Sequence, residues 1–210
     1  MNSDTISNTV VVMAKHWQSG PVKTRLAASI GSNIAREVYR KMAHQYWQQL
    51  ENRQWQRHLW SANHGSAQQL GAWLSGHDKL AVQSGDDLGA RMLNALANTK
   101  YKEWLAVSGT DCPRLSSSYI AVLCEHLEDH DVCIAPTVDG GYAFMAMKVV
   151  HPQLFQNIDW STSQVLRQTL EIAQAAQLKV FLGQELRDLD DIDDLNHFAE
   201  NGDDWARITI

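Results

Sequence analysis

The sequence predicts an α/β fold built on a mixed, mostly parallel β-sheet. Short apolar segments typical of buried strands alternate with helical patterns along the chain. Clusters of polar residues follow several of these strands, as in open α/β sheets that bind ligands at the carboxyl ends of their strands. The length of 210 residues, of which 44% are hydrophobic, suits one domain with a sizeable core. We expect a single domain over residues 1–210, with residues 1–8 flexible.

Composition and charge exclude several classes of protein. The net charge is -6, with 18 Lys and Arg against 24 Asp and Glu, which argues against a general nucleic-acid binder. The three cysteines contain no C-x-x-C pair, so neither a disulfide framework nor a four-cysteine zinc site is expected. No stretch approaches the roughly 18 apolar residues of a membrane span, and no signal peptide is evident. We therefore expect a cytoplasmic protein without a nucleic-acid partner or a membrane span.

In the first half of the chain, strands are predicted at residues 10–14, 57–62, 80–83 and 104–108, and helices at residues 67–74 and 88–97. A longer helix follows the first strand after a loop, with Ser32 or Asn33 as its N-cap. Its apolar positions repeat at helical spacing: Ile34, Val38, Met42, Tyr46 and Leu50.

In the second half, helices are predicted at residues 116–128 and 165–176, and strands at 132–135, 142–147 and 180–182. The Asp-Gly turn between the first two of these strands predicts one antiparallel pair. Ser161 or Thr162 could cap the helix at 165–176. Asp191 opens a last helix through residue 198, and its spacing from Asp194 is that of a capping box.

The loop after the first strand is basic in an otherwise acidic chain. Lys15, Lys23 and Arg25 lie within eleven residues of one another, beside Gly20. A glycine lets backbone N–H groups approach phosphate oxygens, and cations add charge-assisted hydrogen bonds. The segment is not a Walker A loop, and the chain contains no G-x-G-x-x-G. It is either a phosphate-binding loop or a solvated basic loop.

Carboxylates follow later strands. Asp111, between Thr110 and Cys112, stands at a predicted strand end, where it could hold a hard divalent cation or serve as a turn residue. Asp139 precedes Gly140 and Gly141; it could accept hydrogen bonds from sugar hydroxyls, act as a base, or simply form a hairpin turn.

Three further segments carry candidates with two interpretations each. Asp86 or Asp87 could cap the helix at 88–97, Gly89 allows close packing, and Arg91 could reach a phosphate or pair with an acid. Trp160 could present a flat face to a sugar ring or pack internally. Asp188 and Asp190 precede the last helix in an acidic run that could be a solvated surface.

Five of these segments, in this order, resemble a known family. M-A-K-x(4)-G-x-V-K-T-R-L in the first loop is similar to the opening signature of the radical-SAM/selenodomain-associated transferases of type 1. The segments at 83–92, 108–113, 136–142 and 159–163 match later motifs, and Asp188 and Asp190 resemble a D-x-D before the last helix. The chain departs from the family at Trp17, Ser19 and Pro21.

The resemblance implies a GT-A-like, three-layer αβα fold, as in glycosyltransferases and nucleotide-diphospho-sugar transferases. It implies transfer of a glycosyl group from a nucleotide-diphosphate sugar to a small-molecule acceptor, with Mg²⁺ or Mn²⁺ as cofactor. The implied roles are as follows: nucleotide or phosphate binding by Lys15, Gly20, Lys23, Thr24, Arg25 and Arg91; metal binding by Asp111, Asp188 and Asp190; catalysis by Asp139; and sugar or acceptor binding by Gly140, Gly141, Trp160, Ser161 and Thr162.

Two other functions stay open at this point. The family is also similar to nucleotidylyltransferases, in which attack falls on the α-phosphate of a nucleoside triphosphate. A nucleotide-binding protein without catalysis is the third possibility, because Thr110-Asp111-Cys112 is not a D-x-D and the first loop is altered.

Overall fold

The computed structural model describes residues 7–207. In this part of the chain a seven-stranded sheet has the order β3-β2-β1-β4-β6-β5-β7. The strands are β1 (Asn8–Ala14), β2 (Trp55–Ser61), β3 (Lys79–Val82), β4 (Leu105–Ser108), β5 (Val132–Pro136), β6 (Tyr142–Met147) and β7 (Val180–Leu182). The predicted flexibility of residues 1–6 lies outside the described residues, whereas Asn8 already pairs with Trp55 in the sheet.

The sheet is mixed and mostly parallel, as predicted. Strands β1, β2, β3 and β4 form parallel neighbours, and β7 runs parallel to β5. The sequence predicted one antiparallel pair, but the structure has two, because β6 returns from the hairpin and inserts between β5 and β4. The hairpin turn was visible in the sequence, whereas the insertion depends on contacts between distant segments.

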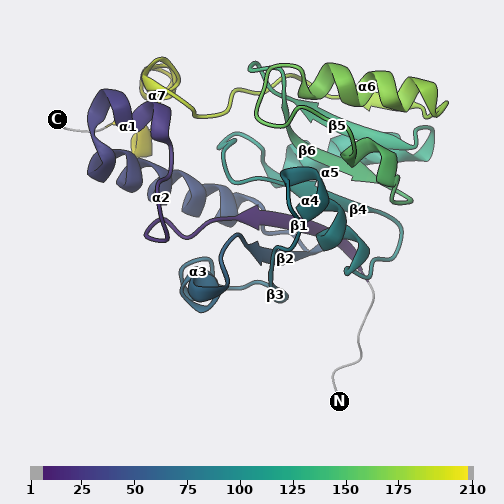
Figure 1. The fold of residues 1–210 in the computed structure, drawn as a ribbon, viewed down its shortest axis with the longest axis horizontal. Coiled ribbons are helices and arrows are strands. Elements are labelled where there is room, and N and C mark those ends of the chain that lie inside the picture. Colours follow the sequence, from purple (N-terminus) through teal and green to yellow (C-terminus); the bar gives the residue numbers. More distant parts are fainter. Residues whose placement is uncertain (1–6, 208–210) are drawn as a thin grey trace.

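Helices cover both faces of the sheet in three layers (Figure 1). They are α1 (Thr24–Ile30), α2 (Ser32–Gln49), α3 (Ala67–Trp73), α4 (Leu88–Ala97), α5 (Ser117–Glu125), α6 (Val165–Ala175) and α7 (Ile192–Glu200). Helices α2, α3 and α5 pack on one face of the sheet, and α4 and α6 on the other. At one end of the molecule α1, α2 and α7 share a separate apolar cluster around Leu26, Met42 and Phe198.

Several predicted local details are wrong. The loop after β1 contains helix α1, whose only fully buried side chain is Leu26, so it carries almost no helical pattern. The N-cap of α2 is Gly31 rather than Ser32 or Asn33. The N-cap of α6 is Gln164 rather than Ser161 or Thr162.

Other local predictions are confirmed. The Asp87 carboxylate caps α4 by accepting from the Ala90 N–H at 2.7 Å, which decides between Asp86 and Asp87. Asp191 and Asp194 form the predicted capping box of α7.

Residues 186–190 cross the carboxyl edge of the sheet and connect its loops. The Leu186 N–H donates to the Pro136 carbonyl after β5, and the Leu189 N–H donates to the Asp111 carbonyl after β4. The Asp190 carbonyl accepts from the Leu26 N–H in α1. These bonds bring loops from three distant parts of the sequence to one edge.

None of the helices within residues 7–207 has the length and apolar character that a membrane crossing requires.

Candidate active site

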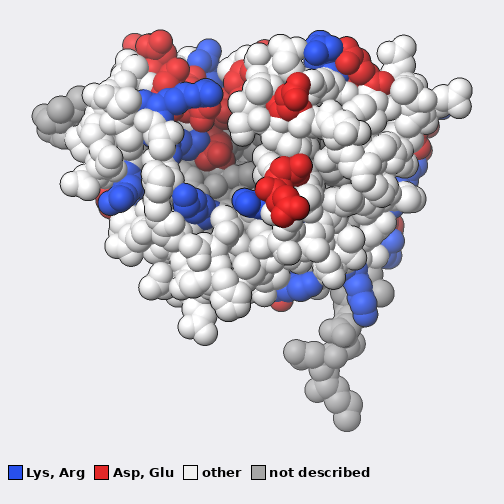
Figure 2. Space-filling view, viewed as in Figure 1, with Lys and Arg blue, Asp and Glu red and all other residues white. Residues whose placement is uncertain are grey.

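A cavity of about 540 Å³ opens at the carboxyl edge of the sheet, between the loops after β4 and β5 and the beginnings of α4 and α6. Figure 2 shows a hollow in this face, with acidic surface inside it and basic patches beside it. The cavity wall contains nine of the predicted site residues: Arg25, Asp111, Asp139, Gly141, Trp160, Ser161, Thr162, Asp188 and Asp190.

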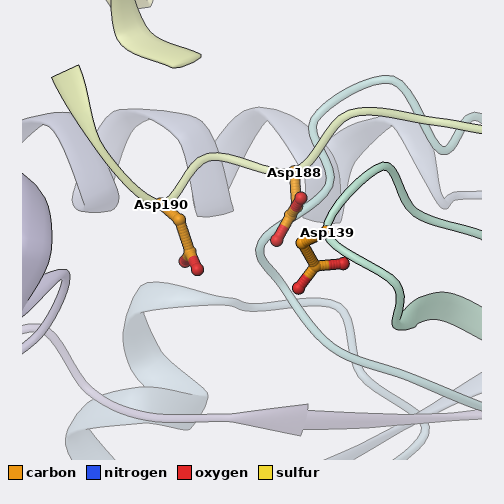
Figure 3. A group of neighbouring side chains, drawn as sticks. All are labelled: Asp139, Asp188 and Asp190. Carbon is orange, nitrogen blue, oxygen red and sulfur yellow. The ribbon is translucent and has the colours of Figure 1, made fainter. Parts of the chain in front are cut away.

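Three carboxylates converge in the cavity: those of Asp139, Asp188 and Asp190 (Figure 3). One oxygen from each lies within 4.8 Å of the other two. Asp139 comes from the hairpin between β5 and β6, and the other two come from the segment that crosses the sheet edge. Carboxylate oxygens in this number are ligands suited to a hard divalent cation such as Mg²⁺ or Mn²⁺.

The local structure fixes one oxygen of Asp139 and leaves the other available. Its Oδ1 accepts from the Thr137 hydroxyl at 2.6 Å and from the Gly141 N–H at 2.9 Å. This is the ordinary turn chemistry that the Asp-Gly sequence indicates. Because the turn uses only Oδ1, the carboxylate can hold its orientation and still offer Oδ2 to a ligand.

Burial and like charges perturb Asp188. Partial burial, with Asp139 and Asp190 nearby, raises the pKa of Asp188 to about 7. Burial likewise raises the pKa of Asp190, although Lys23 and Arg25 act in the opposite direction. A bound cation would relieve this repulsion, so the electrostatics of the cluster fit a metal site.

The three residues predicted to bind metal do not all lie together. Asp139, rather than Asp111, lies in the cluster with Asp188 and Asp190. The Asp111 carboxylate instead pairs with the Lys23 ammonium at 2.8 Å. Lys23 is only 6% exposed and also approaches Asp190 at 3.4 Å. Burial lowers the pKa of Lys23 but these carboxylates outweigh it, and the net shift is upward. Lys23 is therefore a buried counter-ion that connects two acidic segments.

The other predicted phosphate-binding residues differ in position. The Arg25 guanidinium lines the cavity, is 69% exposed, and pairs with Asp190 at 3.1 Å. Lys15 donates to the Pro21 carbonyl and closes its own loop around Gly20. Thr24 is exposed at the start of α1. Arg91 does not line the cavity, and its Nε donates to the Gly85 carbonyl at 3.0 Å.

Part of the cavity wall is apolar. Trp160 lies edge-on to Tyr142 and packs over Gly89, where a Cβ atom would meet the indole at 2.7 Å. Other members of this wall are Met13, Leu88, Met92, Val107 and Val165. Leu88 is 41% exposed, so it presents an apolar surface to whatever enters the cavity.

The polar residues of the W-S-T segment shape the cavity rim. Ser161 has a left-handed backbone with φ of 65°. The Thr162 hydroxyl donates to the Asp159 carbonyl. Gly140 does not line the cavity; a Cβ there would lie 2.3 Å from the Ser163 carbonyl oxygen, so this glycine allows the hairpin to pack against the rim.

Sequence reasoning missed two tyrosines at the site. The buried Tyr39 hydroxyl lies 3.0 Å from the Lys15 carbonyl, to which it donates, and 3.1 Å from the Thr110 hydroxyl, so it joins the loops after β1 and β4. The Tyr142 ring lines the cavity, and its hydroxyl is buried without a hydrogen-bond partner among residues 7–207. Tyr39 lies seven residues before Tyr46 on α2, and this spacing indicates that both face the same side of the helix. The spacing gives no sign that the Tyr39 hydroxyl bonds to the loops after β1 and β4.

Comparison with protein families places the chain. A family model described as "Uncharacterized protein conserved in bacteria (DUF2064)" matches residues 44–162, which is more than half of the sequence. The chain belongs to the DUF2064 family. No curated protein matches this DUF2064 chain.

Solved structures share the fold of this DUF2064 protein. A "putative nucleotide-diphospho-sugar transferase" from Desulfovibrio desulfuricans matches with a TM-score of 0.85 and 26% identity, covering 95% of this chain and 90% of its own. A nucleotidyl transferase from Methanothermobacter matches with a TM-score of 0.58 and 13% identity, covering 93% and 99%. Rv0371c from Mycobacterium tuberculosis, solved with manganese, matches with a TM-score of 0.54 and 16% identity, covering 92% and 98%.

These likenesses support the nucleotide-diphospho-sugar transferase superfamily and the α/β fold predicted from the sequence. The neighbours include transferases of the nucleotidyl and of the sugar-transferring kind. The narrower resemblance to the radical-SAM/selenodomain-associated transferases stays a prediction.

Proposed function

We propose that this protein is a glycosyltransferase that uses a nucleotide-diphosphate sugar and a divalent cation. The observation that carries the proposal is the convergence of Asp139, Asp188 and Asp190 in a cavity that also has apolar lining residues. The likeness to the Desulfovibrio desulfuricans protein over nearly the whole chain supports a nucleotide-sugar donor.

The residues of the cluster fit a metal ion in number and in kind. Asp139, Asp188 and Asp190 would hold Mg²⁺ or Mn²⁺, because both cations prefer oxygen ligands and the cluster offers only carboxylates. The manganese complex of Rv0371c, which shares the fold, supports this choice. When bound, the cation would act as a Lewis acid that stabilises the negative charge of the leaving diphosphate.

The charged and the apolar lining residues suggest how a donor and an acceptor share the cavity. The exposed Arg25 guanidinium can donate charge-assisted hydrogen bonds to phosphate oxygens. The ring of Trp160 and the exposed Leu88 offer apolar contact to the sugar face or to an apolar part of the acceptor. Asp139, fixed by Thr137 and Gly141, also lines the cavity and can orient a hydroxyl group.

Nucleotidyl transfer is the second candidate, favoured by the likeness to the Methanothermobacter nucleotidyl transferase. The same carboxylates and the same Arg25 would then face the α-phosphate of a nucleoside triphosphate. A nucleotide-binding role without catalysis is the third candidate, and it predicts binding with no product.

One experiment separates these candidates. The protein is first screened by thermal shift against nucleotide sugars and nucleoside triphosphates with Mn²⁺ or Mg²⁺, because a ligand of the native state raises its stability. Hits are then incubated with pooled sugar, sugar-phosphate and alcohol acceptors, and followed by ³¹P NMR. Release of nucleoside diphosphate that Asp188→Asn abolishes supports glycosyl transfer. Release of pyrophosphate establishes nucleotidyl transfer instead, and binding without either product contradicts both enzymatic candidates.

A further inference from the structure

Asp190 has two competing sets of partners. Its carboxylate belongs to the cluster with Asp139 and Asp188, which would hold a cation. Both of its oxygens are also engaged by side-chain cations: Oδ1 lies 3.4 Å from the Lys23 ammonium, and Oδ2 lies 3.1 Å from the Arg25 guanidinium. Asp190 can therefore offer an unpaired oxygen to a metal ion only if its ion pair with Lys23 or with Arg25 is broken.

The two cations differ in how firmly they are held. The Lys23 side chain is 6% exposed and has a second, closer partner in Asp111, so moving it would break two ion pairs at once. Arg25 is 69% exposed, and Asp190 is the acid with which it forms an ion pair. Ion pairs with an exposed partner contribute little to stability, so Arg25 is the cation that can leave at small cost.

Arg25 also has a place to go. It lies in the first turn of α1 and lines the cavity, and its long side chain can turn toward a ligand there. A guanidinium matches the oxygens of a phosphate as well as those of a carboxylate. The same group can thus serve Asp190 at one time and an anionic ligand at another.

We propose that Arg25 exchanges partners: it neutralises Asp190 when no metal is bound, and moves to a phosphate group of the ligand when the metal takes its place. This inference rests on the proposed metal-dependent function. It predicts the direction in which Arg25 changes the affinities for metal and for anion. Arg25 opposes binding of the metal alone and promotes binding of the anion, so metal and anion assist each other through it.

The test measures Mn²⁺ affinity without any nucleotide, from the EPR signal of free Mn²⁺. The variants are Arg25→Gln and, as a matched control, Arg167→Gln, which removes an equal charge from an exposed ion pair with Glu171 on α6. We expect Arg25→Gln to bind Mn²⁺ about threefold to tenfold more tightly than the wild type, as expected for release of one ion pair. Arg167→Gln should bind Mn²⁺ as the wild type does.

The second arm measures inorganic pyrophosphate binding by calorimetry at saturating Mn²⁺. Arg25→Gln should bind pyrophosphate at least about fivefold more weakly, because a charge-assisted hydrogen bond is lost. If Arg25→Gln binds Mn²⁺ no more tightly than Arg167→Gln, or binds pyrophosphate as the wild type does, the exchange is overturned.

Asp188→Asn distinguishes failure of this inference from failure of the proposed function. If Asp188→Asn leaves Mn²⁺ affinity unchanged, the carboxylate cluster is not the metal site, and the proposed function fails together with the exchange. If Asp188→Asn abolishes Mn²⁺ binding but Arg25→Gln has no effect, the metal site stands and the exchange alone is wrong. Circular dichroism and melting temperatures verify that each variant is folded, and Arg25 is exposed enough for its replacement to be tolerated.

Discussion

The basic loop after β1 and the acidic segments opposite it use their charges differently. In the loop, Lys15 closes the loop through the Pro21 carbonyl, and Lys23 is buried against Asp111. In the acidic segments, Asp139 gives one oxygen to its own turn and keeps the other, while Asp188 lies half-buried beside two carboxylates. The basic region is thus mostly satisfied by the protein itself, whereas in the acidic region Asp190 is paired but Asp139 and Asp188 form no ion pair within residues 7–207.

This difference changes how the site is understood. The sequence predicted phosphate binding by Lys15, Lys23 and Arg25, but among these three only Arg25 is both exposed and in the cavity wall. The unsatisfied chemistry is that of the carboxylates. Three carboxylates within 4.8 Å of one another are suited to a cation, so we expect the site to bind metal first and phosphate through that metal and Arg25.

The largest expected effect is a loss of stability in the hairpin that carries Asp139. Gly140→Ala should destabilise the protein by about 3 kcal/mol, because a Cβ would lie 2.3 Å from the Ser163 carbonyl oxygen and φ is 88°. At Gly31, φ is 83° but a Cβ would meet nothing within 4 Å, so Gly31→Ala measures the cost of a positive φ alone. At Gly109 a Cβ would also meet nothing within 4 Å and φ is not positive, so Gly109→Ala is the control for the substitution itself. Urea unfolding measures all three. Equal losses for Gly140→Ala and Gly31→Ala would show that the contact with Ser163 does not matter.

The next effect tests whether the basic loop is structural. Lys23→Ala should cost about 2 kcal/mol of unfolding free energy; the loss is below that of a fully buried pair because Asp111 is 52% exposed and can be hydrated. Lys15→Ala, which removes only a hydrogen bond to a carbonyl, should cost less than about 0.5 kcal/mol. Similar losses for the two variants would mean that Lys23 is not the counter-ion that holds the two regions together.

How much of this the sequence could predict depends on the range of the contacts. Buried parallel strands such as β1 are visible because they are continuous apolar runs, and the α7 cap is visible because its partners are three residues apart. Helix α1 was missed because its stability comes from packing on α2 and α7 rather than from its own pattern. Elements whose stabilising contacts lie within a few residues of one another can therefore be predicted from the sequence.

The candidate site was predicted in part for the same reason. The sequence predicted Asp111, Asp188 and Asp190 as the metal set and Asp139 as the catalytic residue, whereas in the structure Asp139 lies with Asp188 and Asp190. Asp139, and not Asp111, lies beside Asp188 and Asp190 because residues 186–190 form hydrogen bonds to the loops after β4 and β5. The hydrogen bond between Lys23 and Asp190 likewise joins residues that are 167 positions apart in the sequence. No pattern in the sequence records contacts of that range.

The third prediction compares two carboxylates. Asp188→Asn should weaken Mn²⁺ binding at least about tenfold, because it removes a ligand charge from the cluster. Asp111→Asn should weaken it less, since Asp111 pairs with Lys23 and lies outside the cluster. Asp193→Asn, an exposed acid on α7, is the control for net charge. Isothermal titration with Mn²⁺ measures all three, and a larger loss for Asp111→Asn would restore the set predicted from the sequence.

The smallest expected effect is a pH dependence of stability in the absence of metal. The pKa of Asp188 is about 7 in the folded protein and 3.8 as the ordinary value expected on unfolding. A folded-state pKa above the unfolded one means that the folded protein binds more protons, so this carboxyl stabilises the fold at low pH. That contribution is full below about pH 4 and is lost as the pH rises toward 7.

Because Asp188 is partly exposed, solvent screening should keep the total change from this group below about 1 kcal/mol. The measurement is the melting temperature from pH 4 to pH 7 in a chelator, for wild type and Asp188→Asn. The wild type should lose stability relative to the variant as the pH rises, because the asparagine has no proton to lose. With saturating Mn²⁺ the wild type should instead gain stability as the pH rises. The cation binds the ionised carboxylates, so its binding to the folded protein strengthens with pH. If the melting temperatures of the two proteins in chelator change in parallel with pH, ionisation of Asp188 does not destabilise the fold. The carboxylates of the acidic region would then be as well compensated as the cations of the basic loop.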